Sequence, residues 1–139
     1  MESEKELLEV ARKYGWKWLV LLKEGSLSES FIEKFQDEVD WESVSIYQQL
    51  SEDFIKKFKD KVNWEGISYF QKLSEEFIIK FQDRIDWKLI SRYQKLSEDF
   101  VLDNFSKIYL AELKRNKYFD FNNIKNKELK LLLELRGES

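Results

Sequence analysis

Apolar and polar positions recur every 23 residues over the middle of the chain, from residue 27 to residue 95. Three consecutive copies, 27–49, 50–72 and 73–95, follow one another without insertions, and the middle copy reads LSEDFIKKFKDKVNWEGISYFQK. A fixed period of about 20–50 residues is typical of proteins that stack one small supersecondary unit on the next. The period therefore predicts a stacked repeat protein.

Each copy contains two helix starts. In the middle copy, Ser51 and Asn63 are residue types that cap helix N-termini, and each is followed four positions later by an apolar residue that can pack on the one before the cap. Helices of roughly two or three turns are unstable alone and must be stabilised by stacking. In one continuous helix each copy would end about 140° past whole turns, so the recurring Trp residues would not share a face. A period of 23 also does not fit heptads. We therefore predict an all-α fold, an α-solenoid of short helix hairpins.

The N-terminal residues 1–26 are predicted to be a degenerate capping repeat. A capping box at Ser3 starts one helix, and a second helix is expected to end at Gly25. Four tryptophans are spaced by 23 residues and are expected to form one buried row: Trp18, Trp41, Trp64 and Trp87.

The C-terminal residues 96–139 begin a fourth copy and then depart from it, because Tyr109 takes the position of the second cap. We expect one long helix over 98–115 and an aromatic loop over 118–124. A last helix should begin after Asn126 and stop at Gly137. No Pro and no Ser- or Gly-rich linker interrupts the chain. We therefore predict a single domain, 1–139, made of an N-terminal cap (1–26), three full repeats (27–95) and a C-terminal cap (96–139).

Composition and charge narrow the functional classes. The chain is 42% hydrophobic and 16% aromatic, with a net charge of −3, so it can form a core but lacks the basic surplus of nucleic-acid-binding proteins. It contains no Cys and no His, which excludes thiol chemistry and removes the commonest metal ligand and general base. The acidic first residues do not resemble a signal peptide, and no apolar run could span a membrane. We expect a cytoplasmic protein that uses no cofactor and binds neither membranes nor, directly, nucleic acid.

The polar residues that recur in every copy are expected to be structural. Three serines lie on the packed side of the second helix, where each can bond to the preceding turn: Ser45, Ser68 and Ser91. Three glutamines near the same side are expected to meet a backbone carbonyl between repeats: Gln48, Gln71 and Gln94. Three Lys–Asp pairs are expected to form exposed i,i+3 ion pairs: Lys34 with Asp37, Lys57 with Asp60, and Lys80 with Asp83. A catalytic carboxylate pair should occur once rather than in every copy, so we predict no enzymatic activity.

Outward positions that differ between copies are the candidates for binding a partner. Five of them are apolar, aromatic or cationic: Ile46, Tyr69, Ile79, Leu89 and Arg92. Tyr and Arg are enriched in the residues that dominate protein–protein binding energy. The copy 27–49 carries six acidic residues and one lysine, a net charge of −5. Its acidic candidates for a second binding surface are Glu33, Glu38 and Glu42.

The phrase LSEDF…W…IS…YQK, over about residues 27–103, resembles tandem repeats of this length in uncharacterised proteins of large DNA viruses, phages and some bacteria. The resemblance implies no enzymatic activity. It implies an interaction module used by a mobile element against a host system. We therefore expect a non-enzymatic protein–protein interaction module of host-interaction or anti-defence type. The alternative is an acidic nucleic-acid mimic that inhibits a nucleic-acid-binding protein.

Overall fold

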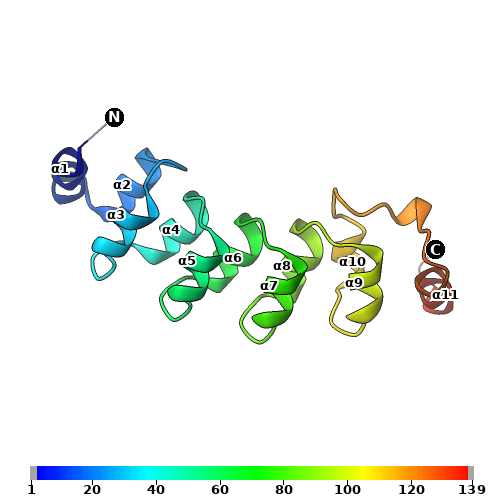
Figure 1. The fold of residues 1–139 in the computed structure, drawn as a ribbon. Helices are drawn as coiled ribbons and strands as arrows, with labels where there is room; N and C mark the ends of the chain where they lie inside the picture. Colours follow the sequence, from blue (N-terminus) through cyan, green and yellow to red (C-terminus); the bar gives the residue numbers. More distant parts are fainter. Residues whose placement is uncertain (1–2, 138–139) are drawn as a thin grey trace. The chain divides into compact units, whose positions relative to one another are not determined.

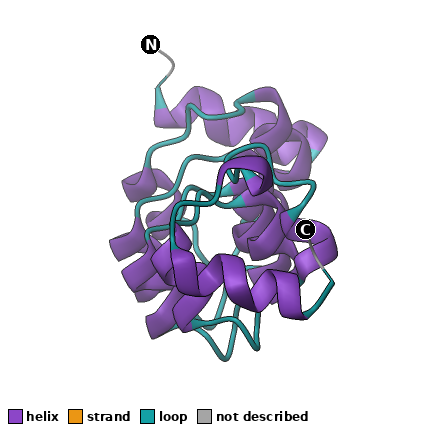
Figure 2. Ribbon diagram, turned by 90° about the vertical axis from the view of Figure 1, so that its right-hand side faces the viewer, coloured by secondary structure: helices purple, strands orange, loops and turns teal. Residues whose placement is uncertain are grey.

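The computed structural model describes residues 3–137, which fall into two compact units, one that ends at Gln71 and one that begins at Lys72. The first unit contains α1 (Glu4–Tyr14), α2 (Trp16–Leu22), α3 (Glu29–Lys34), α4 (Trp41–Tyr47), α5 (Glu52–Lys57) and α6 (Trp64–Phe70). The second contains α7 (Glu75–Lys80), α8 (Trp87–Tyr93), α9 (Glu98–Asp103), α10 (Leu110–Leu113), a 3₁₀ turn (Phe121–Asn123) and α11 (Lys127–Leu135). Figure 2 shows helices, turns and loops, with no strand among these residues. That 1–139 forms one domain stays a prediction.

Each 23-residue copy forms two short helices, as the two caps predict. Figure 1 shows these helix pairs following one another in sequence order within each unit. The second helices of successive copies pack together, α2 with α4 and α4 with α6 in the first unit, and α8 with α10 in the second. The predicted all-α fold and α-solenoid architecture are thereby confirmed.

Side-chain caps set the helix starts. The first helix of each copy follows a serine whose Oγ accepts a backbone N–H three residues later, at 3.1 Å: Ser28, Ser51, Ser74 and Ser97. Asn63 starts α6 in the same way, since its Oδ1 accepts the N–H of Gly66 at 2.8 Å. Ser3 and Glu6 form the predicted capping box of α1. These starts therefore follow from local sequence.

The core of each unit is aliphatic at the centre of the helices. One isoleucine or valine in each helix from α3 to α9 is fully buried: Ile32, Val44, Ile55, Ile67, Ile78, Ile90 and Val101. Phenylalanines in the first helices, such as Phe54 and Phe77, are also buried. Helices this short obtain their stability from this packing.

The tryptophans of the full copies, Trp41, Trp64 and Trp87, are half-buried, not fully buried as predicted. The Trp41 ring contacts Phe54 and Phe58 in the next copy, with centroids 6.1 and 5.3 Å apart. Its Nε1 donates to the carbonyl oxygen of Gln36 at 2.8 Å, in the loop before α4. The indole therefore covers the neighbouring phenylalanines while one edge stays at the loop surface.

The prediction that Trp18 joins this row is wrong, because its side chain is 58% exposed. Trp16 contacts Phe31 and Phe35 instead, with centroids 6.1 and 5.5 Å apart. Gly15, at a φ of 96°, ends α1 and lets α2 begin immediately at Trp16. The first helix pair therefore does not keep the 23-residue spacing. The structural counterpart of the recurring tryptophan is Trp16.

The prediction of one long helix over 98–115 is also wrong, because α9 ends at Asp103 and α10 begins at Leu110. Tyr109 has no capping side chain, but its backbone N–H donates to Ser91 Oγ at 3.0 Å. Ile108, just before it, is buried. The preceding copy holds this break in place, although the local sequence no longer specifies it.

The remaining C-terminal elements follow the prediction closely. Asn126 caps α11 by accepting the N–H of Leu129 at 2.9 Å, and Gly137 lies beyond the helix end at a φ of 75°. The aromatic segment 118–124 is a loop that contains the 3₁₀ turn, and it buries Phe119.

Candidate functional site

In the first unit, Gln48 and Gln71 link successive copies. Gln48 is buried, and its Nε2 donates to the carbonyl oxygens of Val20 and Lys23 at 3.0 and 2.8 Å. Its Oε1 accepts the N–H of Leu27 at 3.0 Å. Gln71 makes the same three kinds of bond one copy later. The predicted contact with a backbone carbonyl is confirmed, and the side chain bridges three backbone groups.

Within each unit, serines and first-turn glutamates also bind neighbouring copies. Ser45 Oγ donates to the Trp41 carbonyl oxygen at 2.7 Å and accepts the N–H of Asn63 at 3.0 Å. The Glu29 carboxylate accepts both the N–H and the hydroxyl of Ser51, at 2.6 and 3.0 Å. The hydrogen-bonding groups of these side chains therefore serve the stacking of repeats.

The predicted i,i+3 ion pairs are wrong for two of the lysines. Lys34 pairs with Glu4, with Nζ 2.7 Å from Oε1, and Lys57 pairs with Glu33. Lys61 contacts Asp37 at 3.0 Å. Each of these three lysines therefore reaches a carboxylate in the preceding helix pair.

One exposed aromatic surface lies on α6. Tyr69 and Phe70 are 39% and 49% exposed, and their rings are stacked with centroids 4.0 Å apart. Ile46 is half-buried on α4, and its Cγ1 would lie 3.2 Å from a Cβ built on the buried Gly66 of α6. We call Tyr69 and Phe70 the aromatic patch. Sequence reasoning missed Phe70, although it differs from the tyrosines at the equivalent positions of the other two full copies.

The candidate binding residues of the second unit differ from one another in exposure. Ile79 is 37% exposed on α7. Leu89 is half-buried. The Arg92 side chain is 30% exposed, and its Nη1 lies 3.7 Å from Glu112 Oε2 on α10. Arg92 therefore has a structural partner inside its own unit.

The acidic candidates also differ in their surroundings. Glu38 and Glu42 are exposed, whereas Glu33 is half-buried and paired with Lys57. Asp37 has a side chain that is 90% exposed although it contacts Lys61. The lysines of the next copy thus offset part of the negative charge of copy 27–49.

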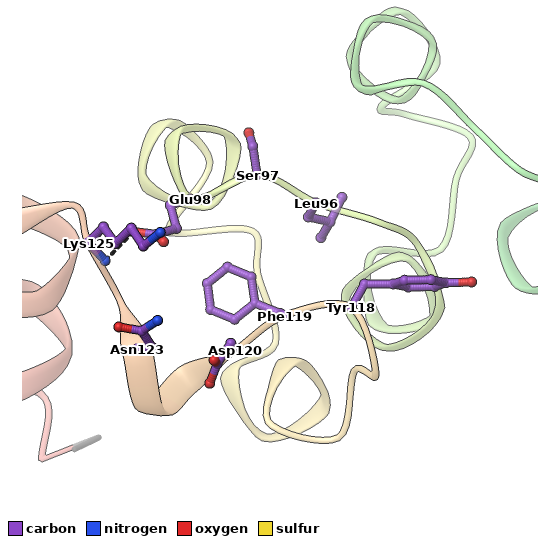
Figure 3. Close-up of a pocket in the computed structure, with 8 residues that line it drawn as sticks. All are labelled: Leu96, Ser97, Glu98, Tyr118, Phe119, Asp120, Asn123 and Lys125. Carbon is purple, nitrogen blue, oxygen red and sulfur yellow. Dashed lines mark hydrogen bonds between the residues drawn. The ribbon is translucent and has the colours of Figure 1, made fainter.

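A pocket of about 310 Å³ lies between the start of α9 and the segment 118–125. Figure 3 shows the Phe119 ring in the middle of its lining, with Glu98 and Lys125 together at one side. The Glu98 carboxylate accepts the backbone N–H groups of Lys125 and Asn126 at 2.9 and 2.7 Å. Asp120 accepts a backbone N–H at 3.0 Å. Both lining carboxylates therefore hold the chain in place, and the lining hydroxyl of Ser97 donates to Glu75 Oε1 at 3.1 Å.

Across residues 3–137, no cluster of three or more acidic side chains has a geometry that could hold a metal ion. In the same part of the chain, no helix has the length and apolar character needed to cross a membrane. No family model, curated protein or solved structure matches the chain.

Proposed function

We propose that this chain is a non-enzymatic protein-binding module and that a partner protein covers the aromatic patch. The observation that carries the proposal is the pair of stacked, exposed rings of Tyr69 and Phe70. Covering exposed aromatic surface is favourable by roughly 25 cal/mol per Å² of apolar area. Aromatic residues are also enriched in the cores of protein–protein interfaces.

The arrangement of the recurring residues supports binding over catalysis. The side chains best suited to chemistry, such as Ser45, Gln48 and Glu29, are hydrogen-bonded between copies. In a stacked repeat the packed positions are fixed by their neighbours, so outward positions are the ones that can vary to fit a partner. We extend the proposal to a host-interaction or anti-defence role in the cytoplasm, for which the support is the resemblance of the repeat phrase to viral and phage proteins.

Replacing both Tyr69 and Phe70 with alanine is expected to weaken partner binding by tenfold or more, as is usual for aromatic residues at the centre of an interface. The melting temperature should change little, because exposed substitutions usually shift stability by less than about 0.5 kcal/mol. The measurement is quantitative affinity capture from cells that contain the protein, followed by titration of the partner.

The matched control is Tyr14→Ala combined with Trp18→Ala. This pair also removes two exposed aromatic rings, 55% and 58% exposed, from the same unit. The proposal requires a partner that the wild-type and control proteins retain and that the Tyr69/Phe70 variant loses. Equal retention by all three proteins would contradict it.

The acidic nucleic-acid mimic remains the second candidate, favoured by the exposure of Glu38 and Glu42 in the most acidic copy. Under this hypothesis, Glu38→Gln with Glu42→Gln should weaken binding more than the loss of the aromatic patch does. Binding should also weaken steeply as salt rises, because exposed charges are screened within about 8 Å at physiological ionic strength. An affinity that is nearly independent of salt would favour the aromatic patch instead. Titrations at two salt concentrations separate the two proposals.

A further inference from the structure

The outer side of α2 is apolar and exposed to solvent. Trp18 and Leu22 are 58% and 62% exposed, and residues four apart on a helix are surface neighbours. Leu21, three residues after Trp18, is half-buried. Leu19 and Val20 are fully buried, so they form the packed side of the helix. Helix α2 therefore buries one apolar side in the first unit and leaves another apolar side open.

This open side corresponds to a side that packs on the preceding helix in later copies. With Trp16 as the counterpart of Trp41, Trp18 takes the position of Ser43 in α4 and of Gly66 in α6. Ser43 and Gly66 are both buried, and a Cβ built on Gly66 would lie 3.2 Å from side-chain atoms of α4. A small residue there lets the preceding helix approach closely. A tryptophan does not permit the same approach, so the outer side of α2 is not suited to stacking on another helix pair.

Cationic groups lie beside the open side. Lys17 is exposed on α2 directly before Trp18. Tyr14, at the end of α1, is 55% exposed, and Lys13 Nζ lies 5.1 Å from the centroid of its ring. Gly15 alone separates Tyr14 from α2, and α1 and α2 contact each other. The junction of α1 and α2 therefore presents aromatic and aliphatic side chains together with lysines.

The charge of this segment has one sign. Four charged residues lie between Glu9 and Glu24, and all four are basic: Arg12, Lys13, Lys17 and Lys23. The first three are exposed. Exposed charges are largely screened beyond about 8 Å at physiological ionic strength. The local basic surplus therefore decides what this surface attracts, although the net charge of the whole chain is −3.

We propose that the cap surface, formed by Lys13, Tyr14, Lys17, Trp18 and Leu22, binds the surface of an anionic lipid bilayer. Tryptophan and tyrosine are enriched at the level of the lipid headgroups, where an apolar ring and a polar edge are both accommodated. Leucine on the same surface can enter the boundary with the acyl chains. The lysine stems lie along apolar surface while their ammonium groups reach the anionic headgroups.

This contact is peripheral, so it requires neither a helix that spans the bilayer nor a basic surplus over the whole chain. The lack of a long apolar run, from which the sequence predicts no membrane binding, does not exclude it. Each basic residue at an anionic surface contributes roughly fivefold to the binding constant. Loss of two lysines is therefore expected to weaken binding by about tenfold or more.

The first test is flotation of the full chain with vesicles of two compositions, phosphatidylcholine alone and phosphatidylcholine with about 30% phosphatidylserine. The wild-type chain should bind the anionic vesicles, and roughly tenfold or more less tightly the neutral ones. Trp18→Ser with Leu22→Ser should weaken binding to the anionic vesicles by about tenfold. Lys13→Gln with Lys17→Gln should weaken it by a similar factor, and this loss should disappear on the neutral vesicles. Circular dichroism verifies that each variant is folded.

Two matched controls come from other surfaces of the same unit. Tyr69→Ser with Phe70→Ser also removes two exposed aromatic rings, and Lys56→Gln with Lys59→Gln also removes two exposed lysines. Both control proteins should bind the anionic vesicles as the wild-type chain does. The Tyr69/Phe70 control also separates this inference from the proposed protein-binding function, because it is expected to lose the partner protein and keep the vesicles.

Four results would overturn the proposal. They are a wild-type chain that does not float with anionic vesicles, equal binding to both vesicle compositions, variants of the cap surface that bind as the wild type does, and controls that lose binding as much as those variants. A fifth concerns another anionic ligand. If an oligothymidylate binds more tightly than the vesicles and through Lys13 and Lys17, the surface serves single-stranded nucleic acid instead.

Discussion

Replacing Gln48 with leucine is expected to lower the free energy of unfolding by about 3–5 kcal/mol, since each buried polar group left without a partner costs about 1–3 kcal/mol. Leucine keeps a similar volume but removes the bonds to the Val20 and Lys23 carbonyls and to the Leu27 N–H. Urea denaturation followed by far-UV circular dichroism measures the change.

The neighbouring residue provides a matched control. Gln49 is exposed, so Gln49→Leu is expected to change stability by less than about 0.5 kcal/mol. The two variants have the same composition and differ only in which glutamine is lost. Equal denaturation midpoints would show that the three hydrogen bonds of Gln48 do not hold successive copies together.

The helix starts could be predicted from the sequence because they depend on residues a few positions apart. Ser51, Asn63 and Asn126 each cap the helix that the sequence indicates. The period of 23 residues then indicated that every copy forms the same pair of short helices, which predicts the all-α stacked architecture.

The failed predictions concern contacts between copies. The break before α10 is maintained by Ser91, which lies 18 residues before Tyr109. The partner of Lys57 is Glu33, in the preceding copy. A pattern of neighbouring residues in the sequence cannot predict these contacts, because they depend on how one copy packs on the next.

The candidate site was predicted only in part, because the exposure of its residues also depends on how the copies pack. A helical wheel identifies Tyr69 and Ile79 as outward-facing, and both are exposed. It cannot show that Arg92 would lie beside Glu112, or that the close approach of α4 to Gly66 would leave Ile46 half-buried. The exposure of Phe70 also could not be predicted from its place in the repeat, since its tyrosine counterpart Tyr47 is half-buried.

Trp41→Ala is expected to destabilise the protein by about 2–4 kcal/mol, somewhat less than the 3–5 kcal/mol typical of a fully buried tryptophan. The substitution removes the ring that covers Phe54 and Phe58 and also the hydrogen bond to the Gln36 carbonyl. Trp18→Ala, at a position 58% exposed, should change stability by about 0.5 kcal/mol or less. The 23-residue spacing alone makes these two tryptophans equivalent, whereas the structure makes Trp16 the counterpart of Trp41. Trp16→Ala should therefore behave like Trp41→Ala in urea denaturation. A destabilisation by Trp18→Ala as large as that of Trp41→Ala would instead support the buried row that the sequence period predicts.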